Sequence, residues 1–305
     1  MHPALRRGLI GVGVAAVLGY GVPIAYLTAN EKHIVFRPDQ MGGRTVLPLP
    51  DSLHLASTPV SLTSGDGAHI TGIVIPAADT AAPWLLYFHG NAGNITSSVL
   101  PQFYARWHAL GVNIFAIDYR GFGASEARTP SEAGVYADAQ AAYDYLRNTR
   151  KVPGEQIIIY GHSLGSGPAT ELALHANAAG LIIEGAFTSV ADMGTRQYPW
   201  LPVRLFVTQR FANIDKIGQV AMPKLILHAR DDAIVPYEMG QAMYKAAKAP
   251  KDWAELKGGH MHAFLVDSAH YWGHASAFVQ RLRDGGPSGE SPAPPVGESA
   301  RLGAK

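Results

Sequence analysis

The sequence predicts an α/β domain in which a mostly parallel sheet is covered by helices on both faces, the doubly wound arrangement. Two observations support this. Short, almost uninterrupted apolar segments are typical of strands buried on both faces of a parallel sheet. Longer segments with apolar residues at helical spacing separate them, so strands and helices alternate. The strand segments are 84–88, 114–117, 157–160, 181–183 and 225–227, and the alternation extends over residues 59–284.

The N-terminal segment differs most from the rest of the chain. Residues 8–27 contain no charged side chain, and Arg6 and Arg7 precede them. About 20 apolar residues are what a helix needs to cross a bilayer. The glycines in this segment are common in membrane helices. We therefore expect residues 1–30 to form an N-terminal transmembrane helix that anchors the protein.

A cleaved signal peptide is the alternative for this segment, because Arg6 and Arg7 would suit its basic start. Cleavage after Ala29 would place Leu27 at a position that prefers a small residue, which favours a retained anchor. Basic residues stay preferentially in the cytoplasm. The arginine pair therefore predicts a catalytic domain on the non-cytoplasmic side of the membrane.

A linker and a β-hairpin are expected after the N-terminal segment, and a disordered tail at the other end of the chain. Residues 31–58 contain three prolines and are expected to form a linker. Segments 60–63 and 70–74 then flank Ser64–Gly65–Asp66–Gly67, which predicts a β-hairpin. At the other end, residues 285–305 are rich in Gly, Pro, Ser and Ala, a composition that predicts a disordered tail.

A helix start is well marked at residues 129–132. Thr129 is expected to be the N-cap, Pro130 the first helical residue and Glu132 the glutamate of a capping box. Apolar side chains then recur at helical spacing, at Val135, Ala139, Ala142 and Leu146.

Composition narrows the classes of function. A chain of 305 residues with 47% hydrophobic side chains can bury the core of one large domain. The formal net charge of +1 gives no basic excess and so predicts no nucleic-acid partner. The absence of cysteine excludes disulfides, thiolate zinc sites and a cysteine nucleophile, and leaves the compartment open.

The sequence GHSLG at 161–165 matches G-x-S-x-G, between a predicted strand and a helix expected from Gly167 to about His175. This context predicts a nucleophile elbow, a strained turn that exposes the hydroxyl of Ser163. The Leu164 amide at the helix N-terminus is then placed to stabilise an oxyanion. His162 is expected to pack beneath the elbow. A merely structural serine is the weaker alternative.

The loop at 89–94, HGNAGN, follows another predicted strand. Folds with such an elbow take their second oxyanion donor from the loop after the corresponding strand. Its glycines let backbone N–H groups face the site. We assign the donated amide to Asn91, with Ala92 as the neighbouring alternative. His89 precedes the nucleophile in the chain and is expected to fix the loop by hydrogen bonding.

The acid of a catalytic triad is expected between the nucleophile and the histidine. After the strand at 225–227 comes the loop HARDDAIVP at 228–236. Asp231 and Asp232 both suit the acid by chemistry and position. Glu184, at the end of an earlier strand, is a more distant candidate.

The base is expected in KGGHMH at 257–262. His260 follows two glycines, which give a loop that can bring an imidazole to the serine, and it is preferred over His262. His270 and His274 share a helix face and could bind a metal with His262. No pattern such as H-E-x-x-H supports a metal site, and no cofactor is implied.

These motifs in combination resemble the BEM46-like α/β-hydrolases, a group that includes ABHD13- and ABHD17-type proteins and is often labelled with the serine aminopeptidase S33 domain. The resemblance covers about residues 31–277. It is carried by EKHIVFRP at 31–38, HGNAGN at 89–94, DYRGFGAS at 118–125, GHSLGSG at 161–167, HARDDAIVP at 228–236 and GGH at 258–260.

The resemblance implies an α/β-hydrolase fold and a triad of Ser163, Asp232 and His260. Asp232 matches the family acid because it stands four residues before Pro236. The resemblance also implies an N-terminal membrane anchor. The chain departs from the family pattern at Ala229, where a glycine is usual, and at Met261–His262, where a polar pair commonly follows the histidine.

The expected chemistry is acyl transfer to water by a serine hydrolase. Residues from about 188 to 222 are expected to form a small helical cap with apolar side chains suited to a hydrophobic acyl group. An ester or thioester is therefore the preferred substrate, and a peptide is the alternative. A non-catalytic ligand-binding protein on the same fold and a membrane-tethered interaction module are alternatives from other classes.

Overall fold

Eight strands form one sheet in the computed structural model, which describes Arg7 and residues 17–285. Their order is β1-β2-β4-β3-β5-β6-β7-β8. The first two pairs are antiparallel and the others are parallel, so the predicted, mostly parallel sheet is confirmed. The strands are β1 Thr58–Thr63, β2 His69–Ile75, β3 Trp84–Phe88, β4 Asn113–Asp118, β5 Ile157–His162, β6 Gly180–Glu184, β7 Lys224–Ala229 and β8 Lys251–Leu256.

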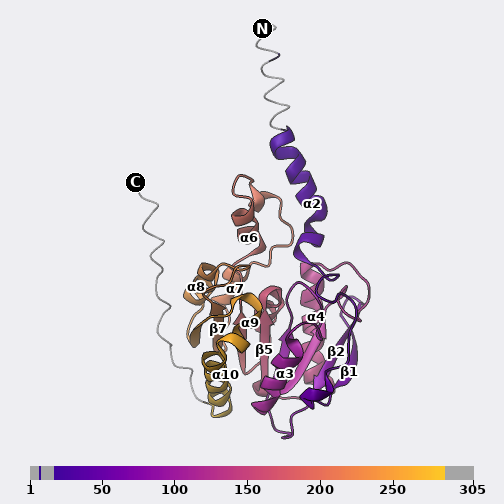
Figure 1. The fold of residues 1–305 in the computed structure, drawn as a ribbon, viewed down its shortest axis with the longest axis vertical. Coiled ribbons are helices and arrows are strands. Elements are labelled where there is room, and N and C mark those ends of the chain that lie inside the picture. Colours follow the sequence, from indigo (N-terminus) through magenta and orange to yellow (C-terminus); the bar gives the residue numbers. More distant parts are fainter. Residues whose placement is uncertain (1–6, 8–16, 286–305) are drawn as a thin grey trace.

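Helices cover both faces of this sheet, as predicted (Figure 1). Leu85 and Leu86 are neighbours on β3 but belong to two different hydrophobic clusters, because successive strand side chains point to opposite faces. One cluster includes side chains of α4 Glu132–Asp144, α5 Ser166–Ala173, α7 Asn213–Ile217 and α8 Tyr237–Ala246. The other includes side chains of α3 Leu100–Ala109, α9 Gly259–Val266 and α10 Ser268–Arg283.

The segment between β6 and β7 contains α6 Val190–Gln197, a short turn of helix at Val203–Leu205, and α7. It occupies the place of the predicted cap. Figure 1 shows α6 rising from the body on the same side as the N-terminal helix α2, Val22–Val35.

Part of the predicted anchor, residues 1–6 and 8–16, lies outside the described residues, as does the predicted tail from 286 onward. In the part of the chain that the structure does describe, no helix is both long and apolar enough to span a membrane. The transmembrane helix therefore stays a prediction.

The predicted helix start at Thr129 is wrong by two residues. Ser131 is the N-cap of α4, and its hydroxyl accepts a hydrogen bond of 3.1 Å from Gly134 N. Glu132 makes no capping box. Its carboxylate instead accepts hydrogen bonds from the amides of Arg210 (2.6 Å) and Phe211 (2.9 Å), and so holds the end of the cap segment.

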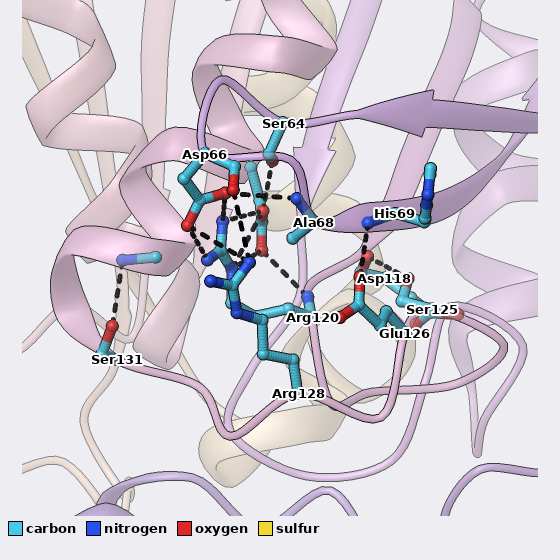
Figure 2. A network of polar contacts seen from close by, with 12 residues as sticks. Ser64, Asp66, Ala68, His69, Asp118, Arg120, Ser125, Glu126, Arg128 and Ser131 are labelled. Carbon is cyan, nitrogen blue, oxygen red and sulfur yellow. Dashed lines mark hydrogen bonds and ion pairs between the residues drawn. The ribbon is translucent and has the colours of Figure 1, made fainter.

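An ion-pair network centred on the buried Arg120 fixes the β1–β2 hairpin to the rest of the domain. The Arg120 guanidinium, 3% exposed, pairs with Asp138 at 2.7 Å and with Asp66 in the hairpin turn. Ser64 donates to the same Asp138 carboxylate at 2.5 Å. Figure 2 shows the turn residues gathered around Arg120. The hydrogen bond from Arg120 is the main reason why the pKa of Asp66 falls to about 2.

Candidate active site

Ser163 occupies a strained turn between β5 and α5. Its φ is +53°, in the left-handed region that non-glycine residues rarely adopt. The two motif glycines are required by close backbone approach. A Cβ on Gly161 would lie 2.3 Å from the Gly165 carbonyl oxygen, and one on Gly165 would lie 2.1 Å from that of Phe88. The backbone at Ser163 thus has the geometry of the predicted nucleophile elbow.

Asp232 and His260 are in direct contact. His260 Nδ1 donates a 2.6 Å hydrogen bond to Asp232 Oδ2. Because Nδ1 carries the hydrogen, Nε2 of the neutral ring is free to accept a proton. Burial would raise the pKa of Asp232, but hydrogen bonds from His260, Val235 N and Ile234 N outweigh it and hold that pKa below its ordinary value.

Asp231 has a different task from its neighbour. Its carboxylate accepts hydrogen bonds from the amides of Gly258 and Gly259, each at 3.0 Å. The bond from Gly259 is the main reason for its lowered pKa. Both glycines have positive φ, 112° and 63°, which a non-glycine residue would adopt only with strain. Asp231 therefore holds the N-terminus of α9, which carries His260, while Asp232 holds the imidazole.

Glu184, the third candidate acid, forms its hydrogen bonds with two tyrosines, and among the described residues it has none with His260. Its carboxylate accepts hydrogen bonds from the hydroxyls of Tyr160 and Tyr271, the latter at 2.9 Å. The two hydroxyls also lie 2.7 Å apart. Burial raises the pKa of Glu184 to about 6. The carboxylate is therefore part of a buried polar cluster beneath the site.

His162 makes a contact that the sequence did not predict. Its Nε2 donates a 2.9 Å hydrogen bond to the backbone carbonyl of His260, and the two rings lie 4.9 Å apart. Burial, and then the charge of nearby His260, lower the pKa of His162 to about 3. A neutral His162 thus connects the elbow to the backbone of the candidate base. No spacing signals this bond, because the two residues are 98 positions apart.

The predicted oxyanion loop is held from both sides. His89 Nδ1 donates to the Gly90 carbonyl at 2.7 Å, which agrees with the expected loop-fixing role, and burial lowers its pKa to about 4. The Asn91 carbonyl accepts a 2.7 Å hydrogen bond from Arg37 N. The segment after α2 therefore sets the position of the loop that carries the predicted amide donor.

Ser163 lies beside the His162–His260 contact. A Cβ on Gly90 would lie 3.5 Å from Ser163 Cβ and 3.4 Å from His162 Nδ1. Among the described residues, the Ser163 hydroxyl has no hydrogen bond to His260. Catalytic hydrogen bonds often form only when substrate binds. The structure thus brings Asp232 and His260 together and leaves the bond from Ser163 unformed.

A cavity of about 350 Å³ lies between α6 and α8, next to the loops that follow β6 and β7. Its lining is mixed and includes Asp192, Arg196, Arg204, Glu238 and Met239. The apolar cap residues expected to receive an acyl group do not line it. Leu201 and Val203 are buried, whereas Trp200 and Leu205 are exposed.

The described histidines, aspartates and glutamates form no group of three that is arranged to hold a metal ion. His270 instead donates through Nδ1 to Asp267 at 2.7 Å.

Comparison with protein families matches a model described as "alpha/beta hydrolase fold" to residues 83–216. An uncharacterized protein of Mycobacterium tuberculosis is 31% identical over 263 residues, which cover 86% of this chain and 91% of the relative. Lysophosphatidylserine lipase ABHD12 of Danio rerio is 31% identical, over 65% of this chain and 55% of its own. Alpha/beta hydrolase domain-containing protein 17B of Homo sapiens is 32% identical, over 63% and 65%.

Among solved structures, an esterase of Pyrococcus furiosus, Pf2001, superposes with a TM-score of 0.65. It is 17% identical and covers 78% of this chain and 96% of its own, a likeness that shows the fold. Together these matches support the ABHD group in general. The narrower resemblance to BEM46-like and ABHD13-type proteins stays a prediction.

Proposed function

This chain belongs to the α/β-hydrolase family, and from that premise we propose that it is a serine hydrolase that cleaves an ester or thioester with Ser163, His260 and Asp232. The observation that carries the proposal is the pairing of a strained elbow serine with an imidazole whose proton is fixed on Nδ1 by a carboxylate. Relatives and neighbours named as a lipase and an esterase support ester chemistry.

In the proposed reaction, His260 Nε2 takes the proton of Ser163 Oγ as this oxygen attacks the substrate carbonyl. Asp232 stabilises the resulting imidazolium. The amides of Leu164 and Asn91 donate to the oxyanion of the tetrahedral intermediate. His260 then protonates the leaving group, and a water molecule, activated by the same imidazole, hydrolyses the acyl-enzyme.

For the substrate we propose an amphipathic acyl ester or thioester. The mixed lining of the cavity between α6 and α8 suits this class, because Arg196 can face a polar or anionic group while Met239 offers apolar contact. The acyl chain would reach the enzyme from a membrane. The uncharged residues 8–27 are proposed to attach the protein to that membrane, with the domain on the non-cytoplasmic side.

The test is kcat/KM for a series of p-nitrophenyl esters of increasing acyl length, with Ser163→Ala as the inactive variant. Removal of a serine nucleophile costs about a million-fold in kcat. Ser61→Ala, the same change at an exposed position of β1, is the matched control and should retain full activity. A rise in kcat/KM with chain length supports the acyl substrate, and a short-chain preference favours a general carboxylesterase.

A different result would redirect the proposal. If no ester or thioester of the series shows Ser163-dependent turnover, the ester proposal fails. Peptides are then tested with the same pair of variants. Tight binding of an acyl ligand without turnover would instead favour a non-catalytic ligand-binding protein.

A further inference from the structure

Large apolar side chains are exposed on two segments that are far apart in sequence but adjacent in space. Around α2 these are Leu18, Tyr20, Val22 and Tyr26, and on the cap they are Trp200 and Leu205. The rings of Tyr20 and Trp200 meet edge to face, with centroids 6.1 Å apart. Figure 1 shows α2 and the cap on the same side of the molecule. We call Trp200 and Leu205 the cap tip.

The cap can bury apolar side chains, so the exposure of the cap tip does not result from a lack of space. Leu201 and Val203, on the same segment, are buried, whereas Trp200 is 52% and Leu205 is 85% exposed. Contiguous apolar patches on a protein surface mark sites of interaction with another protein or a membrane.

The chemistry of the two segments favours a lipid surface. Residues 17–30 and 198–211 contain no aspartate or glutamate, and the second segment carries the exposed Arg210 as well as Arg204, which pairs with Asp192 of α6. Tryptophan and tyrosine are enriched at the membrane–water interface. Arginine can extend to lipid headgroups while apolar neighbours lie deeper.

The contact between Tyr20 and Trp200 also determines how deep Trp200 would lie in the bilayer. The uncharged run ends at Leu27, and Tyr20 lies seven residues earlier, about 10 Å along a helix. A bilayer surface placed at Tyr20 would leave only residues 8–20 of the uncharged run to span it, fewer than the roughly 20 residues that a membrane helix needs. The surface must therefore lie closer to Leu27, which places Trp200 inside it, near the depth of about 5–10 Å that interfacial helices reach.

The cap is also tied directly to α2. Glu31, buried at the end of that helix, accepts hydrogen bonds from the amides of Thr208 (2.7 Å) and Gln209 (2.8 Å) and from the Thr208 hydroxyl. Phe36 and Phe211 pack edge to face just below, with centroids 6.0 Å apart. The helix and the cap therefore keep a fixed relative position.

From these contacts we propose that the cap tip inserts into the interfacial layer of a lipid bilayer beside α2. The insertion rests on the membrane attachment proposed above, but not on the hydrolase chemistry. It holds the cap and the adjacent cavity at the lipid surface. An acyl substrate would thus enter from the bilayer without crossing bulk water.

Tryptophan fluorescence tests this directly. Trp200 is the exposed member of the five tryptophans; Trp84, Trp107 and Trp253 are buried and Trp272 is partly buried. The full-length protein is reconstituted in phosphatidylcholine vesicles whose acyl chains carry bromine near the headgroup or near the bilayer centre. We expect bromine near the headgroup to quench more strongly. Most of this quenching should be lost in Trp200→Phe.

Two results of this experiment would overturn the insertion. One is wild-type fluorescence that brominated lipid does not quench, including the case of a protein that fails to associate with the vesicles. The other is equal quenching in Trp200→Phe. Neither result depends on enzymatic activity, so a failure of the hydrolase proposal would be seen separately, in the ester series.

A second variant tests the consequence for catalysis. Leu205→Glu places a charge at the tip, and Leu47→Glu makes the same change at another exposed leucine, 60% exposed, on the loop before β1. We expect Leu205→Glu to lose about tenfold in turnover of a long-chain ester embedded in vesicles, and to keep its turnover of a soluble short-chain ester. Leu47→Glu should keep both. Equal behaviour of the two variants, or loss of both activities in Leu205→Glu, contradicts the insertion.

Discussion

Two polar clusters of this molecule contain carboxylates paired with nitrogen groups, but only the one around Arg120 has its charged groups fully paired. Around Arg120, one guanidinium faces two carboxylates, and a serine hydroxyl completes the set. Around His260, the Asp232 carboxylate holds the imidazole by a 2.6 Å hydrogen bond and lies 3.6 Å from His228 Nε2, and no arginine or lysine of the described residues forms an ion pair with it. Nearby Ser163 has a strained backbone, and within the part of the chain that the structure describes its hydroxyl has no hydrogen bond to the imidazole.

This difference indicates that the Arg120 cluster serves the stability of the fold, whereas the Ser163 site serves the proposed reaction. In the Arg120 cluster, Arg120 and Arg128 face Asp66 and Asp138, so two positive charges compensate two negative ones, and a network satisfied in this way makes the local structure rigid. In the Ser163 site the backbone bonds hold each group in place but leave the reactive atoms available. His162 and His89 are kept neutral by burial. Strain and perturbed pKa values are typical of functional sites.

The largest effect is expected from Asp232→Asn. The amide cannot hold His260 in the tautomer that accepts a proton at Nε2, and the comparable change in a serine-protease triad costs about 10⁴-fold in kcat. Asp231→Asn is the matched control, because it disturbs only the glycine loop and should cost about tenfold or less. Steady-state kinetics on the best p-nitrophenyl ester decide the order. A larger loss of kcat in Asp231→Asn would identify Asp231, and not Asp232, as the acid of the triad.

In the other cluster, Arg120→Ala should mainly affect stability. It leaves Asp138 buried without its cation, and breaking a buried ion pair costs about 3–5 kcal/mol. Urea unfolding measures this loss, and kcat per folded molecule should stay close to that of the wild type. Arg128→Ala is the control. Its guanidinium is largely exposed and lies 3.7 Å from Asp66, so a loss below about 1 kcal/mol is expected. Similar losses in both variants would contradict the assignment.

Glu184 should make stability depend on pH. Burial raises its pKa from 4.5 to about 6. The protonated form is therefore favoured by folding, and this contribution is present below pH 4.5 and lost as the pH rises through 6. The loss corresponds to about 2 kcal/mol. Unfolding measured from pH 4 to 7 should show this slope in the wild type and not in Glu184→Gln. The control Glu238→Gln, at an exposed position of α8, should keep the pH dependence of the wild type. An unchanged slope in Glu184→Gln would contradict the prediction.

The mostly parallel sheet was predictable because its signals are local. Apolar runs mark strands, and the glycines beside Ser163 meet backbone atoms only a few ångströms away. The N-cap of α4 was mistaken because Thr129 and Ser131 both suit a cap locally. Glu132 was instead recruited by a cap segment about 78 residues away. The task of Asp231 likewise depends on amides 27 and 28 residues further on.

The smallest effect is expected at His162, where a substitution tests whether the residue positions His260 or only fills space. The Nε2–H of His162 donates a 2.9 Å hydrogen bond to the backbone carbonyl of His260 and so links the elbow to the candidate base. His162→Phe keeps the ring and removes this donor, which should lower kcat about fivefold to tenfold, as expected for one lost hydrogen bond, and leave KM unchanged. Because the pKa of His162 is about 3, the loss should be the same at every pH from 5 to 9. His162→Gln, which can still donate, should recover part of the rate, and His175→Phe on the protein surface should change nothing. If His162→Phe retains full activity, the residue only fills space; if the loss varies with pH, the imidazole takes part in proton transfer and its role is catalytic.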